Sequence, residues 1–209
     1  MNKKINILYY ILGILIIAGI IYVALTHNKA VVLAPDLNID PTTLAGIQTG
    51  DYPWPAEIDN LEKRLSEIGL PDLTQESSVL HTHQHIDIFV NGQRVAVPAN
   101  IGLDDAKGFI AIIHTHDETG IAHIESPVAG KFYLGQFFDI WGVRLSSDCI
   151  GSYCNNGDQV LKIFVDGNLF NGDPRTVELQ ARQEITITYG TADQLPSPIP
   201  SSYIFPSGY

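Results

Sequence analysis

Residues 80–90 alternate between two kinds of side chain, and this pattern constrains the fold more than any other feature of the sequence. Apolar residues stand at Leu80, Ile86, Ile88 and Val90, and the alternate positions hold His81, His83, His85 and Asp87. Successive side chains of a strand point to opposite faces, so this segment predicts a strand with one face in the core. Asn91-Gly92 and residues 93–98 follow, which is the strongest short signal for a tight hairpin.

The same hairpin signal recurs at residues 161–165, which precede Asp166-Gly167. The pentapeptides that end at Gly92 and Gly167 differ only in Asn91 against Asp166. Two hairpins that obey one turn rule explain this similarity better than an internal duplication, which is the alternative. Further strands are expected at residues 109–116, 121–125, 176–179 and 184–189.

Two other segments have apolar residues at helical spacing. They are residues 55–68, with Ile58, Leu61, Leu65 and Ile68 before Gly69, and residues 134–141, with Leu134, Phe137, Phe138 and Trp141 before Gly142. The charged residues of the first segment, Arg64 among them, are expected on its solvated face. Together these elements predict an α+β, mostly β fold, a single hairpin-built domain over residues 53–209 that is β-grasp-like or sandwich-like.

The amino-terminal residues predict a membrane anchor. Lys3 and Lys4 precede the uncharged residues 5–25, which as a helix are about 32 Å long, enough to cross a hydrocarbon core of about 30 Å. The two lysines place the amino terminus in the cytoplasm and the rest outside. We therefore expect one transmembrane helix within residues 1–28, a linker over 29–52 and an extracytoplasmic domain at the cell membrane. A cleaved signal peptide is the alternative.

Charge and sulfur content argue against several classes of function. After Lys29 the chain has nine Lys and Arg against all 23 Asp and Glu, a formal charge of −14, which disfavours nucleic-acid binding. Met1 is the one methionine, so thioether ligands for copper(I) are lacking. Cys149 and Cys154 lie in one short loop, and an oxidising compartment favours a disulfide over a thiolate metal site.

Six of the seven histidines lie between positions 81 and 123, in two clusters. On a regular strand His81, His83 and His85 share one face, with neighbours about 7 Å apart. His81 and His85 are then about 13 Å apart, too far for two bonds of about 2 Å to one ion. We expect at most two of the three to bind one metal, and the third to serve a second ion or to support a ligand.

The second cluster consists of His114, His116 and His123. If residues 117–120 form a four-residue loop, His114 lies directly opposite His123 on the neighbouring strand. Three imidazoles on one patch are the geometry that holds zinc or copper with one position open. Glu125 shares the face of His123, and Glu125 and Asp117 are the candidates for a general base or for a group that orients a ring.

Imidazole ligands without thiolates favour copper(II) or zinc. Two interpretations without metal remain for these histidines. One is a pH sensor, and the other is a set of ordinary polar or solvated strand positions. The i and i+2 spacing in both clusters favours a metal site.

The motifs HxHxH at residues 81–85, HTHD at 114–117 and HIES at 123–126 occur together with the segments 68–71, 97–102 and 134–142. In these stretches the chain resembles an uncharacterised family of secreted or membrane-anchored bacterial and archaeal proteins. The resemblance implies a single extracytoplasmic domain behind an anchor and implies no activity.

Three functions are compatible with these features. The first is an anchored protein that captures or buffers copper(II) or zinc outside the membrane, with transfer to a neighbouring membrane protein complex as one use of the bound ion. The second is a metalloenzyme in which His114, His116 and His123 hold an ion that activates water for hydration or hydrolysis, with Glu125 or Asp117 as the base. The third is a structural or interaction subunit of a membrane complex that binds no metal.

Overall fold

The computed structural model describes residues 39–77 and 79–209 of the chain. This part is mostly β with two α-helices, which confirms the expected α+β, mostly β class. Among the described residues no helix has the length and apolar character needed to span a bilayer. The expected anchor within residues 1–28 lies outside the described residues.

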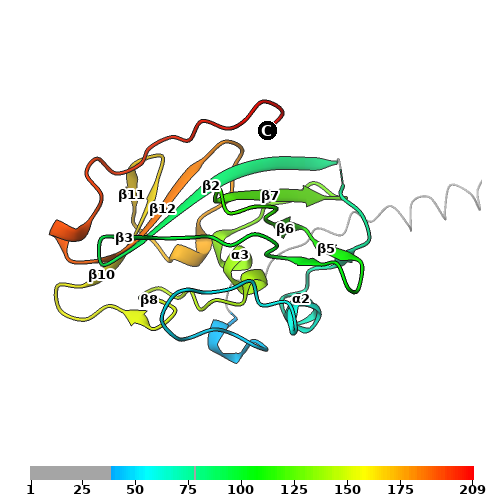
Figure 1. The fold of residues 1–209 in the computed structure, drawn as a ribbon, viewed down its shortest axis with the longest axis horizontal. Helices are drawn as coiled ribbons and strands as arrows, with labels where there is room; N and C mark the ends of the chain where they lie inside the picture. The colour runs from blue at the N-terminus through cyan, green and yellow to red at the C-terminus, as the bar shows by residue number, and fades with distance from the viewer. Residues whose placement is uncertain (1–38, 78) are drawn as a thin grey trace, which may run out of the picture. The chain divides into compact units, whose positions relative to one another are not determined.

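The main sheet has seven strands in the order β11-β10-β12-β2-β7-β6, with β3 also paired to β2 (Figure 1). Its strands are β2 (Leu80–Val90), β3 (Gln93–Val95), β6 (Ile113–His114), β7 (Ile121–Ser126), β10 (Val160–Val165), β11 (Asn168–Phe170) and β12 (Glu184–Gly190). All pairs are antiparallel except β2–β12, which is parallel. The long strand β2 is therefore central, with β12 along one edge and β7 and β3 along the other.

Smaller elements surround this sheet. One small sheet contains β1 (Asp72–Leu73), β5 (Phe109–Ala111) and β4 (Leu103–Asp104), and another contains β8 (Cys149–Ile150) and β9 (Tyr153–Cys154). The helices are α2 (Leu61–Ile68) and α3 (Leu134–Trp141), with short 3-10 turns η1 (Pro41–Thr43), η2 (Pro174–Thr176) and η3 (Ala192–Gln194). The strand expected over residues 109–116 is thus divided at Ile112 between β5, in the first small sheet, and β6, in the main sheet.

Both predicted hairpins are confirmed. Val90 pairs with Gln93 and Val165 pairs with Asn168, which leaves two residues in each turn. The turn residues have φ of 51° and 79° in the first hairpin and 48° and 77° in the second. A two-residue turn with positive φ at both positions matches the twist of the strands, which explains Asn-Gly and Asp-Gly at these places.

Helix α3 has the predicted bounds, and Gly142 ends it in the left-handed region with φ of 80°. All eight of its residues are buried, and it packs against α2 and β6. Ile86, Ile113 and Ile124 belong to the same hydrophobic core as α3. Because side chains alternate along these strands, the histidines lie on the other face of the sheet.

The first predicted helix begins later than expected, at Leu61 instead of residue 55. Asn60 precedes the helix, and its amide and side chain donate to the Glu57 carboxylate, which also pairs with Arg64. The prediction of a solvated Arg64 is wrong. Its side chain is fully buried and donates to the carbonyl oxygens of Asp139 and Ile140 at 2.8 and 3.0 Å.

The strand expected over residues 176–179 is also absent from the described structure. Residues 174–176 form η2, which begins where the Asp173 carboxylate accepts from the Arg175 amide, and Glu178 makes an isolated bridge to Tyr133. The Arg175 guanidinium forms two hydrogen bonds with Asp139 of α3, at 2.8 and 2.7 Å. A buried ion pair therefore holds this segment where alternation of apolar residues predicted a strand.

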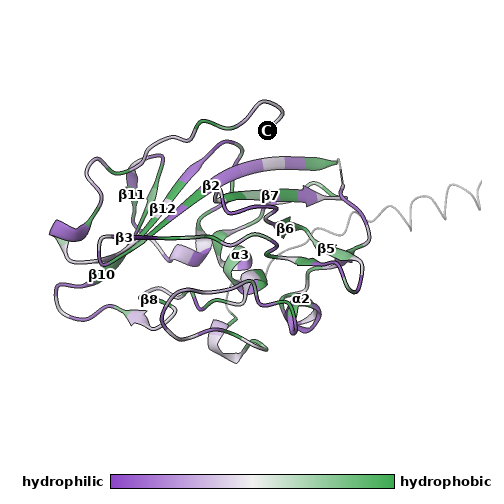
Figure 2. Ribbon diagram, viewed as in Figure 1, coloured by the Kyte–Doolittle hydropathy of each residue, from purple (hydrophilic) through white to green (hydrophobic). Residues whose placement is uncertain are grey.

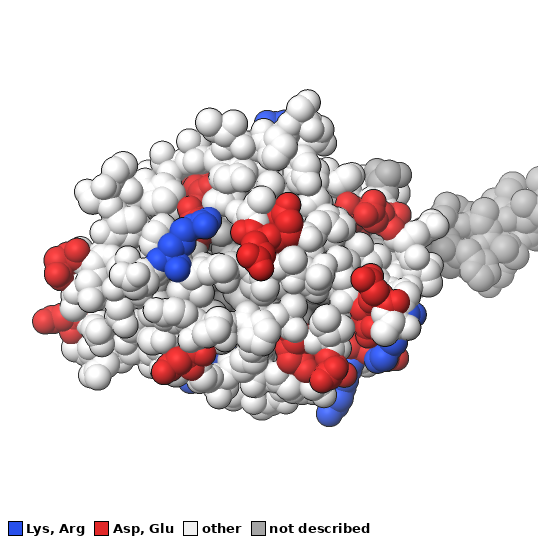
Figure 3. Space-filling view, in the orientation of Figure 1, with Lys and Arg blue, Asp and Glu red and all other residues white. Residues whose placement is uncertain are grey.

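The expected linker over residues 29–52 is described from residue 39 onward. Leu44 is buried in the core, and Gln48 forms a parallel bridge with Val143 and donates to the carbonyl oxygen of Gly142. Residues 39–52 thus pack on the domain. Acidic side chains occur at several separate places on the face shown in Figure 3, with a few basic ones among them.

Replacement of Asp139 by Asn is expected to lower the free energy of unfolding by about 3–5 kcal/mol, because it leaves the buried Arg175 charge without its partner. The exposed pair between Lys131 and Glu178 has the same separation, 2.7 Å, and is the matched control. Glu178→Gln should cost less than about 1 kcal/mol. Denaturant titration measures the free energy of unfolding of both variants. Equal losses in the two variants would contradict a stabilising buried ion pair between Asp139 and Arg175.

Candidate metal centre

Three histidines form one row across three neighbouring strands. His83 of β2 pairs with His123 of β7, and His123 pairs with His114 of β6. The second pair confirms that His114 lies opposite His123, although the connection between β6 and β7 spans residues 115–120 instead of the expected 117–120. The first pair was not predicted, because nothing in the sequence showed that β2 and β7 are neighbours. The two clusters seen in the sequence are therefore joined in the structure.

The rings of five histidines are in contact along this face of the sheet. Ring centroids are 4.7 Å apart for His81 and His83, 4.5 Å for His83 and His123, and 5.3 Å for His123 and His114. His116 follows β6 and lies 4.6 Å from His123. We call these five residues, together with Glu125, the histidine cluster.

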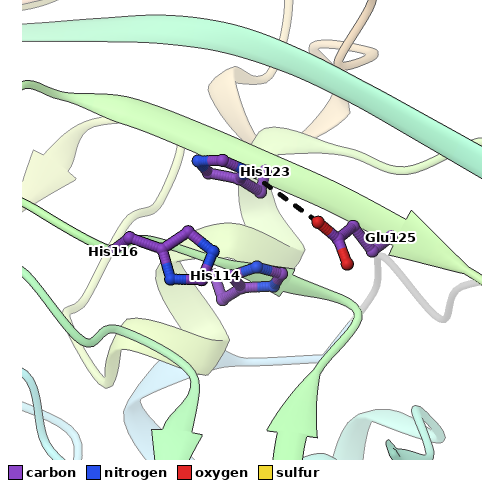
Figure 4. A group of neighbouring side chains, drawn as sticks. All are labelled: His114, His116, His123 and Glu125. Carbon is purple, nitrogen blue, oxygen red and sulfur yellow. Dashed lines mark ion pairs between the residues drawn. The ribbon is translucent and has the colours of Figure 1, made fainter. Parts of the chain in front are cut away.

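Within the histidine cluster, His114, His116, His123 and Glu125 form a first group. One ligand atom from each lies within 4.8 Å of all the others. Figure 4 shows the three rings and the carboxylate placed around one space. They come from β6, from the bend that follows it and from β7. The predicted three-histidine patch is thus present, with Glu125 as a fourth donor.

His114 is buried with only one of its two ring nitrogens hydrogen-bonded. Its ring is fully buried, and Nδ1 lies 3.0 Å from the carbonyl oxygen of Ala111, to which it donates. That bond places the proton on Nδ1 and leaves the lone pair on Nε2. Nε2 is buried and has no hydrogen-bond partner among the described residues. Burial lowers the pKa of His114 to about 4, so the ring is neutral at ordinary pH.

His123 and Glu125 share this buried environment. Burial and the neighbouring His114 lower the pKa of His123 to about 3, whereas burial and the charge of Glu76 raise the pKa of Glu125. His123 Nδ1 and Glu125 Oε2 are buried atoms without a hydrogen-bond partner in the described part of the chain. Three side chains of the first group therefore each have one buried atom without a partner.

A second group consists of His81, His83 and His123, again with ligand atoms within 4.8 Å of one another. His81 Nε2 lies 3.1 Å from His83 Nε2 and 3.2 Å from Glu125 Oε1. Burial lowers the pKa of His83. The histidine-bearing half of β2 is coloured hydrophilic in Figure 2, yet His83 is buried while the His81 side chain is 45% exposed.

His85 is not brought into the histidine cluster. Its Nδ1 lies 2.7 Å from Glu184 Oε2, and its Nε2 lies 2.9 Å from the carbonyl oxygen of Thr119. Tyr203 stacks on its ring at 3.8 Å between centroids. His85, Asp87 and Glu184 also have ligand atoms within 4.8 Å of one another, but both nitrogens of His85 already have partners.

Asp117, the other candidate base, is exposed and lies in the turn between β6 and β7. Its carboxylate accepts hydrogen bonds from the backbone amide and the hydroxyl of Thr119, which lower its pKa. It belongs to none of the groups of ligand atoms found among the described residues. Its position makes it a turn-forming residue, and Glu125 is the carboxylate that reaches the rings.

Several residues near the rings were not predicted from the sequence. The Tyr209 ring lies 4.7 Å from His83 and 5.4 Å from His123 between centroids. Glu76 Oε1 lies 3.9 Å from His116 Nε2, and the Arg182 amide donates to the carbonyl oxygen of His83. None of them carries a motif, and only folding brings them to the site.

Cys149 and Cys154 form a disulfide between β8 and β9. The donors in the histidine cluster are therefore imidazole nitrogens and carboxylate oxygens, without thiolates. Such a set suits copper(II) and zinc.

Comparison of the chain with protein-family models, with curated proteins and with solved structures found no match.

The metal-free protein is expected to lose stability as the pH falls from about 6.5 to about 4. An unfolded histidine takes up a proton near pH 6.5, whereas folded His114 and His123 resist protonation down to about pH 4 and 3. The unfolded state then binds more protons, so acidification favours unfolding. Denaturant titrations at a series of pH values, with a chelator present, give the slope of the free energy of unfolding against pH. His114→Asn should reduce it, and equal slopes in both proteins would contradict the burial of a neutral His114.

Proposed function

We propose that this protein binds a transition-metal ion, copper(II) or zinc, outside the cytoplasm. His114, His116, His123 and Glu125 are the ligands, and their donor atoms lie within 4.8 Å of one another. Metal bonds of about 2 Å to a common centre bring ligand atoms to separations of this order after small side-chain movements. The set of three nitrogens and one oxygen fits both metals.

One observation carries this proposal: buried donor atoms of His114, His123 and Glu125 have no hydrogen-bond partner among the described residues. A buried polar atom without a partner costs about 1–3 kcal/mol. Coordination to an ion compensates such a cost, and the Ala111 carbonyl orients the His114 ring as a supporting group does in metal sites. Neutral, buried rings are also the form of histidine that binds metals.

We further propose that a helix within residues 1–28 anchors the chain in the membrane, with residues 53–209 outside the cytoplasm. The disulfide between Cys149 and Cys154 supports an oxidising compartment. An anchored metal carrier would pass its ion to a neighbouring membrane protein complex. Of the two expected architectures, a mixed main sheet with α3 packed beside it favours the β-grasp-like one.

A second candidate function is water activation by the bound ion. His116 lines a surface cavity of about 350 Å³, together with Glu76, Phe109 and other residues between β1 and β5. A small molecule in this cavity would lie beside the first group. Glu125, whose pKa is raised by burial, would then act as the base.

Metal analysis of the full-length chain, purified without a histidine tag, tests the proposal. After incubation with copper(II) or zinc and removal of free ion, we expect at least about one tightly bound equivalent per chain. His114→Ala combined with His116→Ala should abolish tight binding in the first group, since two of its four ligands are lost.

Asp117→Asn is the matched control, because Asp117 neighbours His116 but belongs to neither ligand group, and it should leave metal uptake unchanged. Uptake below about a tenth of an equivalent in the unaltered chain would refute metal binding. Unchanged tight binding in the double variant would remove the first group from the site.

A further inference from the structure

The histidine cluster contains more donors than one ion takes. Zinc is held by four ligands in closed sites, and copper(II) takes about four strong ligands in a tetragonal arrangement. The cluster offers five imidazoles and one carboxylate. These donors fall into two groups of ligand atoms in the described structure, the first with His114, His116 and Glu125, the second with His81 and His83. His123 belongs to both groups.

His123 has a central position between the two groups. Its ring centroid lies 4.5 Å from that of His83 on β2 and 4.6 Å from that of His116 after β6. An imidazole carries its two nitrogens at different positions of the ring, so one ring can face an ion on each side. When both nitrogens bind metal, the ring gives up its N–H proton to solvent.

Glu125 also lies within reach of both groups. Its Oε1 is 3.2 Å from His81 Nε2 and 3.9 Å from His123 Nδ1, while its Oε2 is buried without a partner in the described residues. The negative charges of Glu125 and of Glu76, 3.9 Å from His116, offset part of the charge of two divalent ions. The cluster thus has a carboxylate near donors of both groups and a second negative charge beside His116, as well as five imidazoles.

We propose that the histidine cluster binds two ions of copper(II) or zinc, one in each group, with His123 between them. This inference rests on the proposed function, because it takes the first group as a metal site. The first group holds its ion more tightly, since His114, His123 and Glu125 are all buried. The second group holds the more exchangeable ion, because it has three ligands and the His81 side chain is 45% exposed.

Copper(II) sulfate titration of the full-length chain, followed by metal analysis and electron paramagnetic resonance, tests this inference. We expect two equivalents per chain and a resonance signal weaker than the copper content requires, because two copper(II) ions that share a ring couple magnetically. His81→Ala with His83→Ala should leave one equivalent with its full, uncoupled signal. His123→Ala should weaken binding of both ions.

Thr82→Ala is the matched control, because Thr82 lies between the two histidines and points to the opposite face of β2. It should keep two equivalents and the coupled signal. His81→Ala alone changes a half-exposed side chain, so it tests the second ion even if the double variant does not fold. This single variant should weaken uptake of the second equivalent and leave the first unchanged.

The outcomes separate this inference from the proposed function. If the unaltered chain binds one equivalent of copper, and the His81 and His83 variants bind the same amount, the proposal of a second ion is refuted. The proposed function is then unaffected. Two equivalents that persist in the His81 and His83 variants also refute the proposed second site, since the second ion is then elsewhere. Uptake of no metal by the unaltered chain overturns both proposals.

Discussion

The pairing of β2 with β7 is the interaction on which the candidate site depends. It sets His83 opposite His123 and His81 opposite Glu125, and β6 extends the same row to His114. Side chains alternate along a strand, so a slip of one residue would turn one strand's donors to the other face of the sheet. The apolar residues of the same strands, such as Ile86 and Ile124, prevent such a slip because they are buried in the core with α3.

His85 differs from the two buried histidines of the first group, His114 and His123. His85 is fully satisfied, since Glu184 and the Thr119 carbonyl engage both of its nitrogens and Tyr203 covers its ring. His114, His123 and Glu125 are also buried, but each keeps one side-chain atom without a hydrogen-bond partner among the described residues. Both nitrogens of His85 are hydrogen-bonded, as in a histidine with a structural role. His114 and His123 each keep a nitrogen without a partner, as expected of a residue that binds a metal.

Much of the fold was predictable because it follows from local rules. Turn geometry requires positive φ at Asn91-Gly92 and at Asp166-Gly167, and both hairpins form as expected. The apolar spacing of α3 and its stop at Gly142 gave its bounds. Two of the errors concern buried arginines whose partners include residues distant in the sequence. Arg64 is buried by partners from residues 57 and 139–140, and Arg175 is held by Asp139, so periodicity alone misplaced both segments.

The sequence by itself determined the faces and the chemistry of the donors. Period-two alternation placed His81 and His83 on one face, and the expected hairpin centred between residues 118 and 119 set His114 opposite His123. Tertiary structure decided that the two histidine clusters are one and that His85 stands apart from them. It also brought Tyr209 and Glu76 to the rings. The physical reason is that alternation and turn length act between residues close in the chain, whereas the choice of neighbouring strands depends on how all apolar faces are buried together.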